Sequence, residues 1–255
     1  MNDFLNRIIR EKEKEAAGIL LPDASGIPDV RQKSLRAAVR QQERTAVIAE
    51  IKFRSPSGGA IAPYTPPKII AGEYLRGGCT AISVLTDGPF FGGKKEYLAD
   101  VAAVSPVPVL RKDFIVDERQ IIEAKVLGAD AVLLIGAIAG ERLGDFHDIA
   151  RGLSMEALVE VRTTKEADLA LSCGAEIIGI NNRDLRTMAV SLETTAVLSG
   201  YLRNEGHDGI IISESGYRTP ADIVSMHHHC DGFLIGSALM ASGNRTCDLR
   251  RFVCA

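Results

Sequence analysis

Short apolar runs rich in β-branched residues alternate with longer amphipathic stretches from about residue 46 to the end of the sequence. This alternation is typical of βα units, in which a helix follows each strand and returns the chain to the same end of a sheet. The eight strand candidates span residues 46–52, 80–86, 107–112, 130–136, 155–161, 176–182, 208–215 and 231–237. Eight successive units with near-continuous apolar strands predict a parallel sheet that closes into an α/β fold of the (β/α)8 TIM barrel type.

Four of the strand candidates, the second, fourth, sixth and eighth, follow a turn of small or polar residues. Their sequences are GGCTAISVL, LGADAVLLI, CGAEIIGIN and HCDGFLIGS. Such a glycine suits the left-handed conformation that ends a helix, so each is expected to mark a helix-to-strand turn. An open doubly wound sheet is the structural alternative. The sequence favours it less, because no GxGxxG follows the first strand and an open sheet would leave two edges to protect.

The segment before the first strand is expected to be a helical extension, residues 1–45, of a single barrel domain in which the barrel itself spans residues 46–255. Its apolar positions have amphipathic helical spacing: Phe4, Leu5, Ile8 and Ile9. This spacing differs from the continuous apolar stretch of a signal peptide, so no export is expected. Later apolar segments are well short of the roughly 20 residues that a membrane helix needs. A soluble protein is therefore expected.

Composition narrows the range of partners. The formal net charge is -3 and no long block of like charge occurs, so the sequence favours neither nucleic acid nor a membrane surface as a partner. A small molecule is the expected ligand of a monomer or weak homo-oligomer. The five cysteines are widely spaced and include no CxxC pair, which is typical of reduced thiols in a cytoplasmic protein. Three adjacent histidines, His227–His229, cannot all point at one ion, and no metal site is expected there.

The stretch PVLRKDFIVD places charges at the end of the third strand candidate. Because side chains alternate along a strand, Leu110 and Lys112 share one face while Arg111 and Asp113 share the other. An inward apolar residue followed two positions later by a polar or charged one recurs at other strand ends. The residues so placed are Glu50 and Lys52 on the first strand, Glu160 on the fifth, Asn181 on the sixth and Glu214 on the seventh.

Two interpretations of these charges are open. Any single one is more simply read as a solvated strand end, because most charged residues are exposed. Together, however, they would meet at the C-terminal end of a barrel, where ligands bind in this fold. A partly desolvated cluster of ammonium and carboxylate groups shifts pKa values and creates separate acids and bases. Arg111 and Asp113, on the outward face, are expected to be structural.

A phosphate site is the second expectation. SPSGG (55–59) follows the first strand, SESGYRTP the seventh and IGSALM the eighth. The loops after strands seven and eight of such barrels often bind phosphate, so Gly216, Gly236 and Ser237 are the candidates, although Gly-Ser pairs also cap ordinary helices. The loop DGPFFGGKKEYL after the second strand is expected to wall the substrate or close over it, unless Phe90 and Phe91 merely plug the core.

The chain resembles the indole-3-glycerol phosphate synthase family. The segments that carry the resemblance occur in the family's order over residues 46–241: AEIKFRSPSGG, ISVLTDGPFFGG, PVLRKDFIVDERQIIEA, GADAVLLI, LVEV, GAEIIGINNRDL, ISESGYRTPADI and GFLIGSALM. The N-terminal extension also has a family counterpart that covers the site mouth or the barrel rim. The resemblance implies a lyase of tryptophan biosynthesis that closes 1-(2-carboxyphenylamino)-1-deoxyribulose 5-phosphate to indole-3-glycerol phosphate, with loss of carbon dioxide and water and no cofactor.

The resemblance also implies roles for the candidate catalytic residues. Lys112 would be the acid that activates the substrate ketone, and Glu160 the partner that transfers protons in the later steps. Lys52 would hold the substrate carboxylate with Glu50 hydrogen-bonded nearby. The residues that would orient the substrate and these side chains are Asn181, Glu214 and Ser215.

The same resemblance implies a binding set. Ser55 would join Gly216, Gly236 and Ser237 around the phosphate, and Arg183 would help to close the site. Phe91 and Phe114 would pack against the anthranilate ring. Two departures from the family pattern, Phe53–Arg54 and Arg162, bear on substrate affinity more than on reaction type.

Two rival functions are compatible with parts of this pattern. Another phosphate-binding barrel, such as a phosphoribosyl isomerase or the tryptophan synthase α subunit, would share the last two phosphate loops but not the acid–base set. A non-catalytic barrel that binds a phosphorylated metabolite would tolerate loss of acid–base residues, and in this sequence none is lost.

Overall fold

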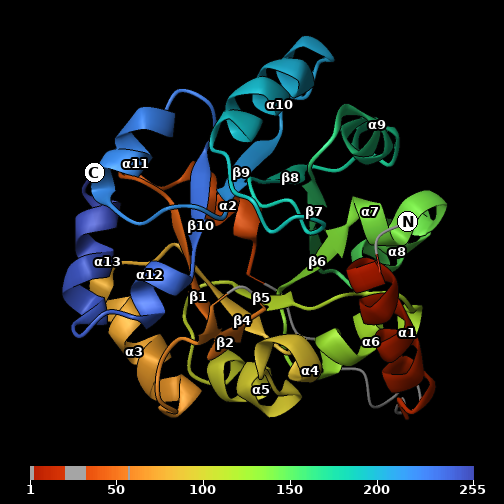
Figure 1. Cartoon of the computed structure of the whole chain (residues 1–255), viewed down its shortest axis with the longest axis horizontal. Coiled ribbons are helices and arrows are strands. Elements are labelled where there is room, and N and C mark those ends of the chain that lie inside the picture. Colours follow the sequence, from red (N-terminus) through yellow and green to blue (C-terminus); the bar gives the residue numbers. More distant parts are fainter. Residues whose placement is uncertain (1–2, 21–32, 57) are drawn as a thin grey trace.

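The computed structural model describes residues 3–20, 33–56 and 58–255, and its centre is a closed barrel of eight parallel strands (Figure 1). Around the barrel the strands follow the order β1-β10-β9-β8-β7-β6-β5-β4, and β1 pairs with both β10 and β4. The strands are β1 (Val47–Ile51), β4 (Ala81–Leu85), β5 (Val109–Lys112), β6 (Ala131–Ile135), β7 (Glu156–Val161), β8 (Ile177–Asn181), β9 (Ile210–Glu214) and β10 (Gly232–Ile235). The predicted TIM barrel is confirmed, and the open-sheet alternative is wrong.

Helices surround the barrel (Figure 1). Those after β1 are α3 (Pro67–Gly77), α4 (Gly88–Phe91), α5 (Lys95–Ala102), α6 (Glu118–Val126), α7 (Gly136–Ala139), the 3-10 turn η2 (Gly140–Arg142), α8 (Leu143–Gly152), α9 (Thr164–Ser172), α10 (Glu193–Asn204), α11 (Pro220–Met226), α12 (Ser237–Met240) and α13 (Arg245–Val253). A hairpin of β2 (Arg54–Ser55) and β3 (Gly59–Ala60) follows β1, and the sequence pattern did not predict it. None of the helices in the described ranges is both long and apolar enough to cross a membrane.

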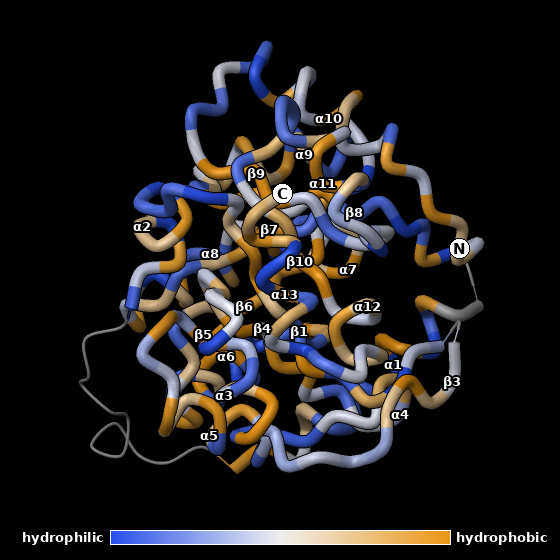
Figure 2. The backbone as a smooth tube through the Cα atoms, turned by 90° about the vertical axis from the view of Figure 1, so that its left-hand side faces the viewer, coloured by the Kyte–Doolittle hydropathy of each residue, from blue (hydrophilic) through white to orange (hydrophobic). Residues whose placement is uncertain are grey.

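Alternation along the strands divides the buried apolar side chains into two layers. One layer fills the barrel and includes Ile48, Leu110, Leu133, Leu158 and Ile212. The other lies between the strands and the surrounding helices and includes Val47, Val84, Val132, Val159 and Ile211. Both faces of the sheet are therefore apolar, as a covered parallel sheet requires. In Figure 2 the orange, apolar stretches include strands in the middle of the molecule.

Glycines end three of the helices as the sequence predicted. Gly78, Gly128 and Gly174 have φ values of 89°, 86° and 71°, which is the left-handed region that glycine enters without steric cost. The fourth turn differs, because Gly232 lies inside β10. A side chain there would press on Ile212 at 3.0 Å and on Ala46 at 3.2 Å, so the glycine lets neighbouring strands approach rather than ending a helix.

The N-terminal extension contacts both ends of the barrel. Helix α1 (Asp3–Ala17) reaches the C-terminal ends of β4 and β5 through Lys12, and its Ile8 joins the inner apolar layer. Helix α2 (Leu35–Arg40) lies at the opposite end, where Ser34 donates to Glu156 at the start of β7. The expected amphipathic N-terminal helix is confirmed, and no described residue of α1 or α2 belongs to the cavity lining. The side chain of Phe4 and residues 1–2 and 21–32 lie outside the described part.

Candidate active site

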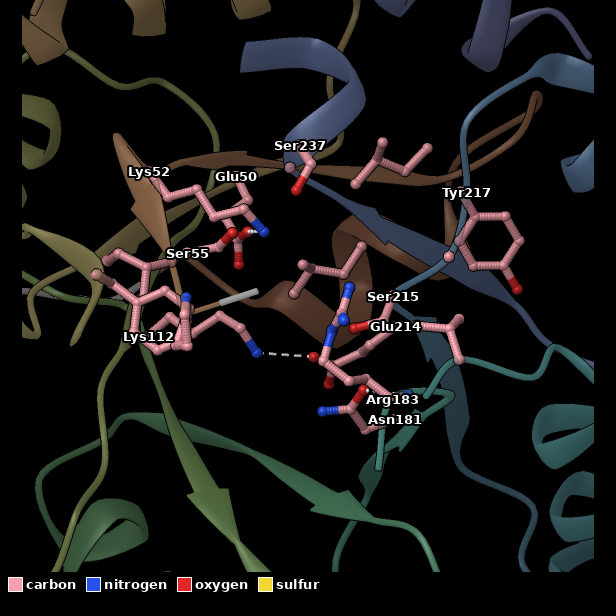
Figure 3. Close-up of a pocket in the computed structure, with 18 of the residues that line it drawn as sticks. Glu50, Lys52, Ser55, Lys112, Asn181, Arg183, Glu214, Ser215, Tyr217 and Ser237 are labelled. Atoms are coloured by element: carbon pink, nitrogen blue, oxygen red, sulfur yellow. Dashed lines mark hydrogen bonds and ion pairs between the residues drawn. The ribbon is translucent and has the colours of Figure 1, made fainter. Parts of the chain in front are cut away.

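A cavity of about 830 Å³ opens at the C-terminal ends of the strands, and Figure 3 shows side chains converging on it from several of them. This volume is in the range of small-molecule sites. Every residue that the sequence nominated lies in its lining. From the acid–base set these are Glu50, Lys52, Lys112, Glu160, Asn181, Glu214 and Ser215, and from the binding set Ser55, Phe91, Phe114, Arg183, Gly216, Gly236 and Ser237. Ser57, in the SPSGG stretch, lies outside the described residues.

Lys112 is the centre of the polar cluster. Its Nζ lies 2.8 Å from Oε2 of Glu214 and 3.4 Å from Oε2 of Glu160. Asn181 donates from Nδ2 to the other oxygen of Glu160 at 2.9 Å, which orients that carboxylate. The inward ends of β5, β7, β8 and β9 thus bring one ammonium, two carboxylates and one amide into contact.

Burial and mutual charge fix the ionisation of this cluster. Burial alone would lower the pKa of Lys112, but Glu214, Glu160 and Glu50 raise it well above its usual value, so Lys112 carries a proton at neutral pH. Burial raises the pKa of Glu214 to about 7, although Lys112 opposes the rise. The Oε1 atom of Glu214 is buried and has no hydrogen-bond partner in the described part of the chain. The protonated ammonium of Lys112 and the carboxyl group of Glu214, whose pKa is close to neutral pH, therefore lie side by side.

Two glycines leave the space that the charged side chains occupy. Lys52 and Glu50 form a second ion pair at 2.5 Å, and a methyl group on Gly236 would collide with Glu50 and lie 2.9 Å from Lys52. A methyl group on Gly179 of β8 would collide with Oε1 of Glu214. Both glycines are therefore required by close approach of charged groups rather than by turn geometry.

The turn after β9 has an unusual backbone. Ser215 and Gly216 have φ values of 69° and 101°, and a non-glycine residue in this region is uncommon and often marks a functional site. Asn182 holds the turn by donating from Nδ2 to the carbonyl of Ser215 at 3.1 Å. Arg183, next along the chain, donates to the carbonyl of Met188 at 3.1 Å. Ser215, Gly216 and Arg183 line the part of the cavity expected to receive an anion, together with Gly236 and Ser237 after β10.

Aromatic rings form another wall. The ring centroids of Phe91 and Phe114 are 5.9 Å apart, and those of Phe90 and Phe114 are 6.5 Å apart. Leu133 and Leu234 add aliphatic surface from β6 and β10. Phe90 and Phe91 pack against the inner apolar layer while Phe91 also lines the cavity, so the two interpretations of this loop, a substrate wall and a core plug, both hold in part.

Arg111 lies outside the cavity lining, as the alternation predicted, whereas Asp113 is part of that lining, and both residues are buried. Arg111 contacts Asp113 at 3.2 Å and Glu123 of α6 at 2.9 Å, and it donates to the carbonyl of Gln120 at 2.8 Å. These contacts hold the end of β5 against α6. The sequence pattern did not reveal that these charges would be buried and paired.

Arg218 and Asn182 were missed from the sequence, and Arg162 was noted there only as a departure from the family pattern, without its contact. Arg218 lines the cavity beside Gly216, and together with burial its charge lowers the pKa of Arg183. Arg162 donates to the carbonyl of Asn181 at 3.0 Å. Asn182 is fully buried beneath the Ser215 turn. Arg218 could have been found from its place two residues after Gly216, whereas the partners of Arg162 and Asn182 depend on tertiary contacts.

A closed parallel barrel with a cavity and a buried cluster of ammonium and carboxylate groups at the C-terminal ends of its strands has the architecture of a (β/α)8 enzyme. A family model described as indole-3-glycerol phosphate synthase matches residues 8–252, and the chain belongs to that family. Its members are decarboxylating carbon–carbon lyases of tryptophan biosynthesis, and the chain accordingly makes indole-3-glycerol phosphate.

Curated relatives carry the same description. The chain is 42% identical over 243 residues to the indole-3-glycerol phosphate synthase of Deinococcus radiodurans, which covers 94% of this chain and 91% of that protein. It is 47% identical over 212 residues to the one of Carboxydothermus hydrogenoformans, covering 81% and 80%.

Solved structures with low sequence identity share the fold. Tryptophan synthase from Mycobacterium tuberculosis superposes with a TM-score of 0.66 at 14% identity, covering 87% of this chain and 98% of that one. Thiamine phosphate pyrophosphorylase from Pyrococcus furiosus gives a TM-score of 0.62 at 16% identity, covering 86% and 96%. At such identities the likeness concerns the barrel alone.

Proposed function

We propose that Lys112 is the general acid of the ring closure. The observation that carries this proposal is the contact of its ammonium with Glu214 and Glu160 inside the cavity, next to the aromatic wall. In the first step an aromatic carbon of the substrate attacks the ketone carbon, and the ketone oxygen takes a proton from Lys112. Stabilising the developing negative charge on that oxygen is the main requirement of the step.

Glu160 serves the later proton transfers. After the carbon–carbon bond forms, carbon dioxide leaves and the ring regains its aromatic character. The new hydroxyl group then leaves as water, which requires a proton on the oxygen and removal of a proton from the nascent indole ring. Glu160, oriented by Asn181 and 3.4 Å from Lys112, is close enough to exchange protons with the same substrate atoms.

Lys52 and Glu50 hold the carboxylate end of the substrate. The Lys52 ammonium is paired with Glu50 at 2.5 Å and is partly exposed to the cavity, so a substrate carboxylate can join the pair. The anthranilate ring stacks beside Phe91 and Phe114, whose centroids are 5.9 Å apart. Glu214 and Ser215 orient the substrate from β9.

The phosphate lies at the turns after β9 and β10, with Gly216, Gly236 and Ser237 as its cradle, and Ser55 also lines this cavity. Arg183 and Arg218 supply positive charge at this end of the cavity. Two neighbouring guanidinium groups repel one another, and a phosphate dianion between them removes that repulsion. Arg218 is thus added to the set that the sequence nominated.

We further propose that the chain is one domain that acts in the cytoplasm as a monomer or weak homo-oligomer, without nucleic acid or membrane partners. Ile8 and Leu35, from the two helices of the extension, pack in the inner apolar layer of the barrel, which supports one folding unit. The five cysteines are free thiols, which supports a reducing compartment.

The test is a fluorescence time course of indole product formation from 1-(2-carboxyphenylamino)-1-deoxyribulose 5-phosphate. Product should form without added metal, and the dephosphorylated substrate should bind far more weakly. Absence of product at micromolar enzyme would refute the catalytic proposal. Equal affinity for the two substrates would refute the phosphate site while leaving the acid–base roles intact.

A further inference from the structure

The side chain of Lys12, on helix α1, is completely buried. Its ammonium lies 2.8 Å from carboxylate oxygens of Glu15, Asp87 and Asp113. A buried ammonium is costly unless it is closely paired, so this residue differs from the solvated charges elsewhere on the helix. Lys14, two positions further on, has a side chain 72% exposed and contacts Glu11.

The first buried partner, Asp113, belongs to the strand end that carries the general acid. It follows Lys112 directly, and its Oδ1 accepts from the backbone N–H of Phe114 at 2.9 Å. Its Oδ2 accepts from Thr86 at 2.5 Å and from Arg111 at 3.2 Å. The Lys12 contact is therefore one of the interactions that fix the backbone between Lys112 and Phe114.

The second buried partner, Asp87, belongs to the aromatic wall. Its Oδ2 accepts from the backbone N–H groups of Phe90 and Phe91 at 2.8 and 2.9 Å, which caps α4. Asp87 is fully buried, and its Oδ1 lies against Lys12. One ammonium thus joins the loop that carries Phe91 to the strand end that carries Lys112.

Removal of that ammonium would leave two neighbouring carboxylates buried with less compensation. Asp113 would still be paired with Arg111. Of the contacts described here, Asp87 would keep only those from the backbone N–H groups of Phe90 and Phe91. Like charges in a low dielectric repel, so the two segments would move apart or take up water. General acid catalysis depends on placement, and a displacement of about 1 Å can cost roughly a hundredfold in rate.

We propose that Lys12 is a positioning residue of the ring closure, which sets the spacing between Lys112 and the aromatic wall from outside the cavity. The inference rests on the proposed role of Lys112 as general acid. Lys12 lies outside the cavity lining and acts through Asp113 and Asp87. The N-terminal extension is then part of the catalytic apparatus rather than only a cover of the barrel rim.

Steady-state kinetics of Lys12→Met at 25 °C test this inference. We expect kcat to fall at least about tenfold and KM to rise, because both connected segments shift. Lys12→Arg keeps the positive charge and should therefore keep most of the kcat of the parent enzyme. A Lys12→Met enzyme with kcat within threefold of the parent would overturn the inference.

Two controls separate positioning from general loss of stability. Val39→Ala removes a buried methyl pair from α2, at the opposite end of the barrel, and should lower the melting temperature with kcat unchanged. Lys14→Met removes an exposed charge from α1 and should alter neither quantity. An equal fall of kcat in Val39→Ala and Lys12→Met would show that stability alone is responsible, and would also overturn the inference.

Lys112→Ala assayed in parallel distinguishes the two proposals. An active Lys112→Ala enzyme would remove the general acid and, with it, the inference. An inactive Lys112→Ala beside a fully active Lys12→Met would overturn the inference alone. Where Lys12→Met does not fold, Asp87→Asn replaces it, since the amide can still cap α4 without the charge that pairs with Lys12. A raised KM in Asp87→Asn supports the inference, and unchanged kcat and KM contradict it.

Discussion

The ammonium of Lys112 lies 2.8 Å from Oε2 of Glu214, and the two residues come from β5 and β9, which stand on opposite sides of the barrel. Their contact therefore crosses the interior of the barrel within the cavity lining. The second oxygen of Glu214 is buried without a hydrogen-bond partner in the described ranges. A ketone oxygen that takes the place of Glu214 beside the ammonium would accept a hydrogen bond from Lys112 instead.

The raised pKa of Glu214 makes stability depend on pH. Burial raises it from 4.5 to about 7, so folding favours the neutral form. This contribution is complete below pH 4.5 and is lost as pH rises to about 7. Between those limits the free energy of unfolding of the parent protein should fall by up to about 3 kcal/mol relative to that of Glu214→Gln. Melting temperatures of the parent protein and of Glu214→Gln at pH 5 and pH 8 check this. The same difference between the two melting temperatures at both pH values would contradict the assignment.

Gly179→Ala should damage catalysis through Glu214. The new methyl group would collide with Oε1 of Glu214 and lie 3.3 Å from Leu158, so the carboxylate must leave its place beside Lys112. We expect kcat to fall about tenfold or more and stability to fall by about 1–3 kcal/mol. Gly200→Ala in α10 is the matched control, because its methyl group meets nothing within 4 Å and should stabilise the helix. Equal kcat values for the two variants would refute this reasoning.

Arg218→Ala should weaken substrate binding more than chemistry. Arg218 lines the end of the cavity proposed for the phosphate. Together with burial, its charge lowers the pKa of Arg183. Loss of one charge-assisted contact predicts a KM raised about tenfold with kcat little changed. Arg151→Ala, which removes a side chain 72% exposed on α8, should leave both constants unaltered. The same KM for both variants would exclude Arg218 from the phosphate site.

Much of this architecture could be predicted from the sequence because strand periodicity is local. The apolar runs predicted eight strands, and alternation within the third predicted that Lys112 points inward and Arg111 outward. The hairpin of β2 and β3 escaped prediction because two-residue strands carry no periodic signal. Gly232 was assigned to a turn because a glycine required by strand packing looks like one required by backbone conformation.

Long-range pairing set the other limit. Lys12 was not singled out in the sequence, and its partners Asp87 and Asp113 lie 75 and 101 positions away in the chain. Nothing in local spacing indicates that such a charge will be buried. The same holds for Asn182, whose neighbours Ser213 and Thr195 lie on other elements.

The role of Lys112 as general acid is decided by the turnover of Lys112→Ala with saturating substrate, measured by indole fluorescence. Removal of the ammonium deletes the proton donor while Glu160 and Asn181 keep their hydrogen bond. We expect a kcat lowered at least about a hundredfold, the usual scale for a general acid, with the protein still folded and still binding substrate. A folded Lys112→Ala enzyme with near-normal turnover would contradict it.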